Sequence, residues 1–113
     1  GGLTPADLVN AVDNAEVLTV KIGETVLAEG DTGDDIYVIR SGSMAVEKMI
    51  GGRPIFLSYL PAGAFFGEMA VLGGGQRTAT VKAAVKSEVI KLRGEDFRRI
   101  LDHNSAYTLH RLE

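Results

Sequence analysis

Short runs of alternating apolar and polar residues, each closed by a glycine-containing turn, dominate most of this chain. The first run covers residues 17–22 and ends at Gly23, and the second covers residues 25–28 and ends in a Gly- and Asp-rich turn. Further runs follow at residues 36–40, 43–50, 55–60, 79–84 and 87–92. Runs of about five residues at regular turn spacing predict antiparallel strands in a sandwich or barrel, and not alternating strands and helices.

Both ends of the chain carry helical patterns. Residues 4–12 are predicted to form a short helix, because they begin with a capping threonine and a proline and carry an apolar stripe. Near the other end, residues 97–101 are amphipathic, and Ser105 is placed to cap a second helix from Ala106. The large aromatic side chains are expected to fill the core: Tyr37, Phe65, Phe66 and Phe97.

The composition of the chain argues against several classes of function. The formal net charge is −3, which argues against direct nucleic-acid contact by this segment because such contact needs a basic face. The absence of cysteine excludes disulfides and thiolate metal sites. No apolar run approaches the roughly 20 residues that span a bilayer, so no membrane contact is expected. We expect a cytoplasmic protein, or the cytoplasmic domain of a membrane protein.

Residues 65–81, FFGEMAVLGGGQRTATV, carry the clearest chemistry. They predict a strand end, one short helical turn, a glycine loop and a returning strand. The planar donors of Arg77 match two oxygens of a phosphate, and Thr78 adds a hydroxyl beside them. The carboxylate of Glu68 suits a sugar hydroxyl, and backbone N–H groups at residues 67–70 supply further donors. The stretch therefore suits a small ligand with a hydroxyl at one end and a phosphate at the other.

Other phosphate-binding motifs fit this stretch less well. A P-loop requires a Gly-Lys-Ser/Thr sequence, whereas Gln76-Arg77 follows Gly75 here. A dinucleotide-binding glycine loop requires a parallel sheet, which the strand pattern does not predict. The glycines also suit an ordinary hairpin loop. On residue chemistry alone, a structural salt bridge between Glu68 and Arg77 is as well supported as ligand binding.

Residues 66–72 followed by 77–81 closely resemble the phosphate-binding cassette of the cyclic nucleotide-binding domain family. Residues 30–39 and Gly42 are similar to the family's Gly-Asp turn, tyrosine-containing strand and glycine, and the resemblance extends over residues 17–101. It implies a mainly β fold: an antiparallel β-roll of the double-stranded β-helix or jelly-roll type with an N-terminal helix, a short cassette helix and C-terminal helices.

We therefore expect a single domain over residues 1–113. Its parts would be an N-terminal helical segment over 1–16, the β-roll over 17–93 with the cassette at 65–81, and C-terminal helices over 94–113 that continue in a longer protein.

The resemblance also assigns roles to individual residues. It implies that Glu68 accepts a hydrogen bond from the ribose 2′-hydroxyl, that Arg77 pairs with the exocyclic oxygens of the cyclic phosphate, and that Thr78 adds a side-chain hydrogen bond. Further residues are expected to contribute backbone to the cassette or to lie near the base: Gly67, Met69, Ala70 and Ala79 for the backbone, and Val46 and Ser58 for the base.

The function implied is sensing without catalysis. The ligand would be cAMP or cGMP, with cAMP slightly favoured, because Thr78 fits a guanine amino group while many bacterial members with a hydroxyl there respond to cAMP. No other cofactor is expected. Binding would act through the C-terminal helices, hinged near residues 92–97, on an effector in the same parent chain or a partner subunit.

Two rival functions remain at this point. The first is a degenerate domain of the same fold that serves as a protein interaction module. The second is a cupin-type enzyme, which requires a metal cluster of His and Glu on strands. His103 and His110 both fall in the terminal helical region, and no third ligand accompanies them. Asp31, Asp34 and Asp35 resemble part of a calcium loop, but the helices and the closing glutamate of such a loop are missing.

Overall fold

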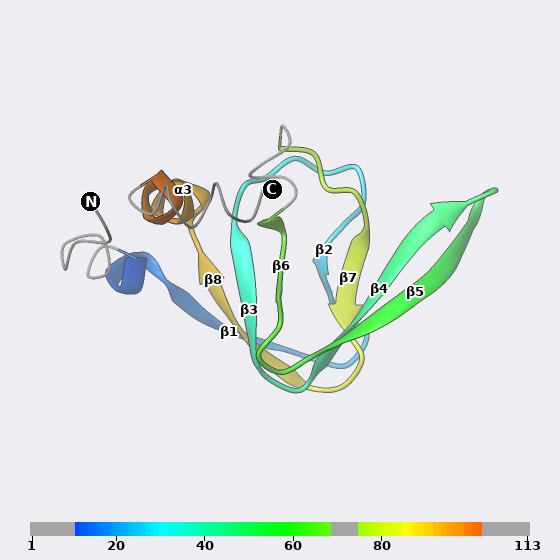
Figure 1. Cartoon of the computed structure of the whole chain (residues 1–113). Coiled ribbons are helices and arrows are strands. Elements are labelled where there is room, and N and C mark those ends of the chain that lie inside the picture. The colour runs from blue at the N-terminus through cyan, green and yellow to red at the C-terminus, as the bar shows by residue number, and fades with distance from the viewer. Residues whose placement is uncertain (1–10, 69–74, 103–113) are drawn as a thin grey trace.

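A computed structural model gives the fold and describes residues 11–68 and 75–102 (Figure 1). Residues 11–14 are helical and precede eight strands and one helix, α3. In chain order the elements are β1 Glu16–Val20, β2 Thr25–Leu27, β3 Ile36–Ser41, β4 Ser43–Ile50, β5 Arg53–Pro61, β6 Phe65–Phe66, β7 Thr80–Ala83, β8 Ser87–Leu92 and α3 Gly94–Asp102.

The strands form two four-stranded sheets, and every pairing is antiparallel. One sheet has the order β1-β8-β3-β6 and the other the order β2-β7-β4-β5. Alternation along β3 turns the side chains of Tyr37 and Ile39 inward, where the inner faces of both sheets meet. The core is continuous and consists of Val20, Leu27, Tyr37, Ile39, Met44, Phe66, Val81, Ala83 and Val89. The predicted antiparallel β-roll is therefore confirmed.

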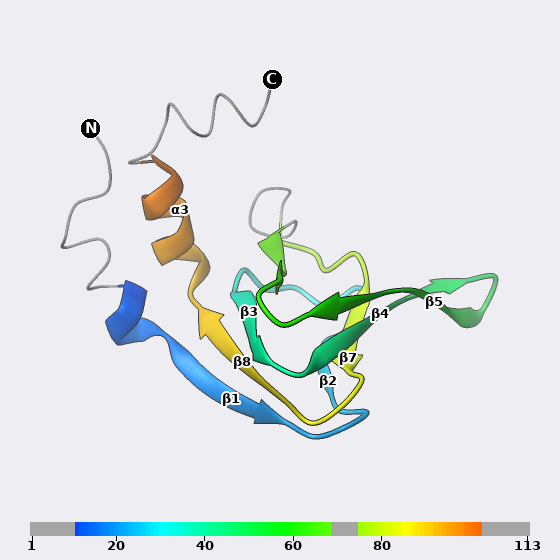
Figure 2. The same ribbon diagram turned by 60° about the horizontal axis from the view of Figure 1, so that its bottom comes forward.

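β4 and β5 form a long hairpin that runs away from the rest of the roll, opposite α3 (Figure 2). β5 is an edge strand, and its side chains are exposed except for Leu60, which is partly buried. The pairing shifts register between Val46 and Glu47, which leaves Leu57 as an extra residue on β5. Because of this bulge, Phe56 and Tyr59 point to the same face of β5 although they are three residues apart. Their ring centroids are separated by 4.7 Å.

The two ends of the described chain meet at α3. The side chain of Asp96 is 2% exposed and forms ion pairs with Arg93 and Arg99. It also accepts a hydrogen bond from Asn14 Nδ2 at 3.4 Å, which joins the N-terminal helical segment to α3. The helix begins at Gly94, ahead of the amphipathic stretch, because the N–H groups of Asp96 and Phe97 both donate to the carbonyl of Arg93.

Several expectations require correction or lie outside the described residues. Phe65 is 50% exposed, so its assignment to the core is wrong, whereas Tyr37 and Phe66 are buried. Alternation explains the difference, since neighbouring residues of β6 point to opposite faces. The start of the N-terminal helix, most of the cassette helix and the second C-terminal helix lie outside the described residues. Within those residues, no helix combines the length and apolar character that crossing a membrane requires.

Candidate functional site

A cavity of about 270 Å³ lies between the residues of the cassette and the inner face of β4 and β5. This volume is close to the lower end of the range of roughly 300–1,000 Å³ that small-molecule sites occupy. The cavity wall includes seven of the predicted site residues: Gly67, Glu68, Arg77, Thr78, Ala79, Val46 and Ser58. Met69 and Ala70 lie outside the described residues. The remaining wall is apolar and consists of Leu27, Leu60, Phe65, Phe66 and Val81.

Arg77 is fixed at the wall of this cavity although its side chain carries a charge. Its backbone exchanges hydrogen bonds with the β2–β3 loop, since Gly30 N donates to Arg77 O at 2.8 Å and Arg77 N donates to Asp31 O at 2.7 Å. The residue is only 6% exposed. Its guanidinium donates from Nη1 to Gly67 O and from Nη2 to Asp35 O, both at 3.0 Å. Backbone carbonyls thus orient the cation without neutralising it.

Two glycines make room for this guanidinium. A Cβ on Gly33 or on Gly67 would lie 3.1 Å from a terminal nitrogen of Arg77. Gly67 also has a φ of +97°, a conformation that side chains other than glycine rarely adopt, and a Cβ there would lie 2.8 Å from Asp35 O. The positive φ and the close approach of Asp35 O and Arg77 therefore require glycine at position 67.

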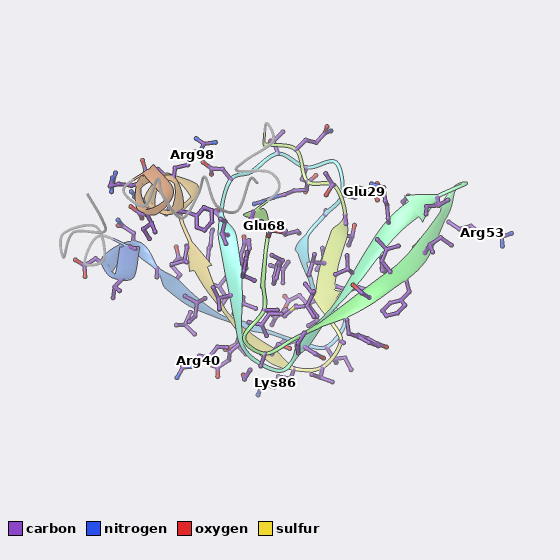
Figure 3. The ribbon with its side chains drawn as sticks, in the orientation of Figure 1. Glu29, Arg40, Arg53, Glu68, Lys86 and Arg98 are labelled. Carbon is purple, nitrogen blue, oxygen red and sulfur yellow. The ribbon has the colours of Figure 1, made fainter. Side chains whose placement is uncertain are left out.

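Glu68 lies inside the roll, where Figure 3 labels it, at the end of β6. Its Oε2 is buried, and no hydrogen-bond partner for it exists among the described residues. Nor does an ion pair join Glu68 to Arg77 within the part of the chain that the structure describes. The alternative of a structural salt bridge is therefore wrong. A buried acceptor without a donor is the arrangement expected of a group that awaits a ligand hydroxyl.

The part of the cavity wall formed by β4, β5 and β7 is suited to a flat apolar group. Val46 in β4 pairs directly with Ser58 in β5 and with Val81 in β7, so these side chains lie together on one face. Thr78 lines the same cavity and is exposed. Ser58 and Thr78 are the hydroxyl-bearing residues of the wall, and each hydroxyl can both donate and accept a hydrogen bond.

Tyr37 supports the cavity wall from behind. Its ring stacks on Phe66 with a centroid separation of 5.2 Å and an interplanar angle of 10°. Burial raises the pKa of the Tyr37 phenol above its ordinary value of 10.0, and the nearby Lys91 ammonium opposes this shift. The stack fixes Phe66, which lines the cavity.

Several contributors to the site were missed from the sequence. The sequence marks Asp35 only as part of the Gly-Asp turn and of an incomplete calcium-loop pattern, yet its carbonyl holds Arg77 and its carboxylate pairs with Lys91 at 3.6 Å. Phe65 was assigned to the core and instead lines the cavity. The one available signal was the Gly-Asp turn of the family, which marks the loop but not the carbonyl. Within residues 11–68 and 75–102, no group of three or more His, Cys, Asp or Glu side chains could hold a metal ion.

Comparison with known proteins adds independent findings. The family model of the cyclic nucleotide-binding domain matches residues 17–104. A cyclic nucleotide-gated potassium channel of Mesorhizobium japonicum is 36% identical over 98 residues, which are 87% of this chain and 26% of the channel. A cAMP-dependent protein kinase regulatory subunit of Emericella nidulans is 34% identical over 99 residues, which are 88% of this chain and 24% of the subunit. This chain therefore spans about a quarter of the length of these relatives.

A solved structure agrees with these matches. The catabolite activator protein of Thermus thermophilus is 29% identical and superposes with a TM-score of 0.74, over 97% of this chain and 55% of that protein. The two antiparallel sheets, the cavity at the cassette and the family match over residues 17–104 agree. The chain belongs to the cyclic nucleotide-binding domain family.

Proposed function

We propose that this chain senses a cyclic nucleoside monophosphate, prefers cAMP to cGMP, and relays binding to an effector without catalysing a reaction. The observation that carries the proposal is the pairing of opposite chemistries across one cavity. Arg77 presents an oriented cation, Glu68 presents a buried acceptor, and among the described residues neither an anionic partner for Arg77 nor a donor for Glu68 Oε2 is found. A cyclic phosphate and a ribose hydroxyl satisfy both groups at once.

Each site residue then has a role in the proposed complex. Arg77 holds the exocyclic phosphate oxygens, and Glu68 accepts from the ribose 2′-hydroxyl. Thr78 adds a side-chain hydrogen bond. Backbone groups of the cassette line the phosphate, and two side chains on the facing strands lie near the base: Gly67, Met69, Ala70 and Ala79 for the cassette, and Val46 and Ser58 for the base.

The preference for cAMP is the finer part of the proposal. It is supported by a relative whose name states that its kinase depends on cAMP. The base side of the cavity is largely apolar, which suits adenine as well as guanine. Thr78 also permits a contact with the guanine amino group, so we expect cGMP to bind as a weaker second ligand.

Relay to an effector is proposed to run from Arg77 to α3 through the β2–β3 loop. Asp35, whose carbonyl holds the Arg77 guanidinium, pairs through its carboxylate with Lys91 on β8. The neighbouring Asp34 carbonyl packs so closely on Gly94, the first residue of α3, that a Cβ at Gly94 would overlap it. If the β2–β3 loop shifts when Arg77 binds a phosphate, the packing of the first residue of α3 against Asp34 therefore changes as well. The effector belongs to the parent protein or to a partner subunit.

Titration calorimetry tests the function directly. The folded protein is titrated with cAMP, cGMP and, as an acyclic control, 5′-AMP. We expect micromolar or tighter binding of cAMP, weaker binding of cGMP and much weaker binding of 5′-AMP, which lacks the cyclic phosphate. Folded protein that produces no heat with either cyclic nucleotide would contradict the proposal, and would favour the alternative of a degenerate domain used for protein contact.

A further inference from the structure

Lys48 makes a contact with the cassette that the roles proposed above do not use. It lies two residues after Val46 in β4, so its side chain shares the face that lines the cavity. Its Nζ donates to the carbonyl oxygen of Thr78 at 2.7 Å. A residue of the β4–β5 hairpin thus holds the backbone beside Arg77.

Glu29 fixes the lysine in turn. Figure 3 labels Glu29 between β7 and the hairpin, and its Oε2 lies 3.6 Å from Lys48 Nζ. Its Oε1 accepts from the N–H of Met49 at 2.8 Å, and its own N–H donates to Thr80 Oγ1 at 3.0 Å. Glu29 and Lys48 therefore clamp the β2–β3 loop, the hairpin and the segment that carries Thr78.

This clamp completes the immobilisation of the segment. Backbone bonds to Gly30 and Asp31 hold Arg77 from the side of the β2–β3 loop, and Lys48 holds Thr78 O from the side of the hairpin. In a trans peptide the carbonyl and the following N–H point to opposite sides. Fixing Thr78 O therefore also fixes the direction of the N–H of Ala79, a residue of the cavity wall.

We propose that Lys48, braced by Glu29, is a positioning residue that sets base selectivity by fixing the orientation of Thr78. This inference rests on the proposed function, because it concerns how the same site distinguishes cAMP from cGMP. Lys48 does not line the cavity itself, and its side chain is 44% exposed. Its effect on the ligand therefore passes through the Thr78 peptide.

Lys48→Met tests this role because it keeps the length of the side chain and removes the charged donor. Calorimetry with both nucleotides is expected to show that the cGMP affinity falls about three- to tenfold more than the cAMP affinity, the scale of one hydrogen bond. Loss of the lysine also removes its ion pair with the Glu29 carboxylate, and the remaining negative charge disfavours any anionic ligand. That repulsion acts equally on two nucleotides of the same charge, so the affinity ratio isolates the orientation of Thr78.

Three further variants separate positioning from general stability. Lys48→Arg retains a cationic donor and should restore most of the selectivity. In a Thr78→Ala background, Lys48→Met should no longer change the ratio, because the group that it orients is gone. Lys86→Met, at an exposed lysine in the turn between β7 and β8, is the matched control and should leave both affinities unchanged.

The unliganded protein is tested by hydrogen exchange at the Arg77 amide, which donates to Asp31 O. We expect faster exchange in Lys48→Met and no change in Lys86→Met. Binding of both nucleotides by the wild-type protein with an unaltered affinity ratio in Lys48→Met would overturn the positioning role while leaving the proposed function intact. A wild-type protein that binds neither nucleotide would overturn both, and the exchange rates would still show whether Lys48 clamps the segment.

Discussion

Arg77→Ala is expected to separate ligand binding from folding. The guanidinium forms two hydrogen bonds to backbone carbonyls, Gly67 O and Asp35 O, each at 3.0 Å. Bonds from a charged donor contribute about 1.5–3 kcal/mol each, so their loss removes roughly 3–6 kcal/mol. Against this, Arg77 is 6% exposed and forms no ion pair with any described carboxylate. Its desolvation costs several kcal/mol.

Because these two effects oppose one another, the free energy of unfolding of the unliganded variant should remain within about 2 kcal/mol of wild type. Binding should respond far more. Removing one partner of a buried, hydrogen-bonded charge pair costs about 2–5 kcal/mol. At 25 °C this weakens the Kd for cAMP roughly 30-fold to several-thousand-fold.

Urea unfolding of the unliganded protein and calorimetry with cAMP measure the two effects. Arg77→Lys should bind with intermediate affinity, because it keeps the charge but loses the planar pair of donors. Arg40→Ala is the matched control, since Arg40 is exposed in β3. A Kd for Arg77→Ala within about threefold of wild type, or a loss of more than about 4 kcal/mol of stability, would refute the reasoning. The second result would make Arg77 a structural residue.

The remaining predictions address neighbouring parts of the account. Replacing cAMP by 2′-deoxy-cAMP should weaken binding to wild type by about 1.5–3 kcal/mol, but should change binding to Glu68→Ala little, as measured by calorimetry. Thr78→Ala should lower the affinity for cGMP more than that for cAMP; an equal loss would remove its role in selectivity. Gly94→Ala should lower stability by about 1–3 kcal/mol in thermal unfolding, because its Cβ overlaps the Asp34 carbonyl. Burial raises the pKa of Tyr37 above 10.0, so its protonated form stabilises the fold at lower pH and this stabilisation is lost as the pH rises above 10. Tyr37→Phe should flatten that alkaline loss in pH-dependent unfolding.

The sequence predicted the strands well because alternation and glycine turns are local signals. The predicted strands at 43–50 and 87–92 coincide with β4 and β8. The two-residue β6 was seen only as a strand end, because two residues do not establish a period. The exposure of Phe65 and the bulge at Leu57 depend on which neighbour a strand pairs with, and short-range patterns do not contain that information.

The same distinction between local and long-range information applies to the residues of the site. Glu68 and Arg77 could be identified because the cassette keeps their chemistry within one short stretch. The partners that hold the cassette are distant in sequence: Asp35 O lies 42 residues from Arg77, and Lys48 lies 30 residues from Thr78. A backbone carbonyl has no residue type that identifies it, so only the fold could show that Asp35 orients the guanidinium. The absence of a salt bridge between Glu68 and Arg77 likewise needed three-dimensional geometry.

A crystal structure of the protein with cAMP tests the central claim most directly. The account predicts that the cyclic phosphate lies within hydrogen-bond distance of the Arg77 guanidinium and that the ribose 2′-hydroxyl donates to the Glu68 carboxylate, with the base between the cassette and the inner face of β4 and β5. A cAMP molecule bound elsewhere, or in this cavity with its phosphate away from Arg77, would contradict it.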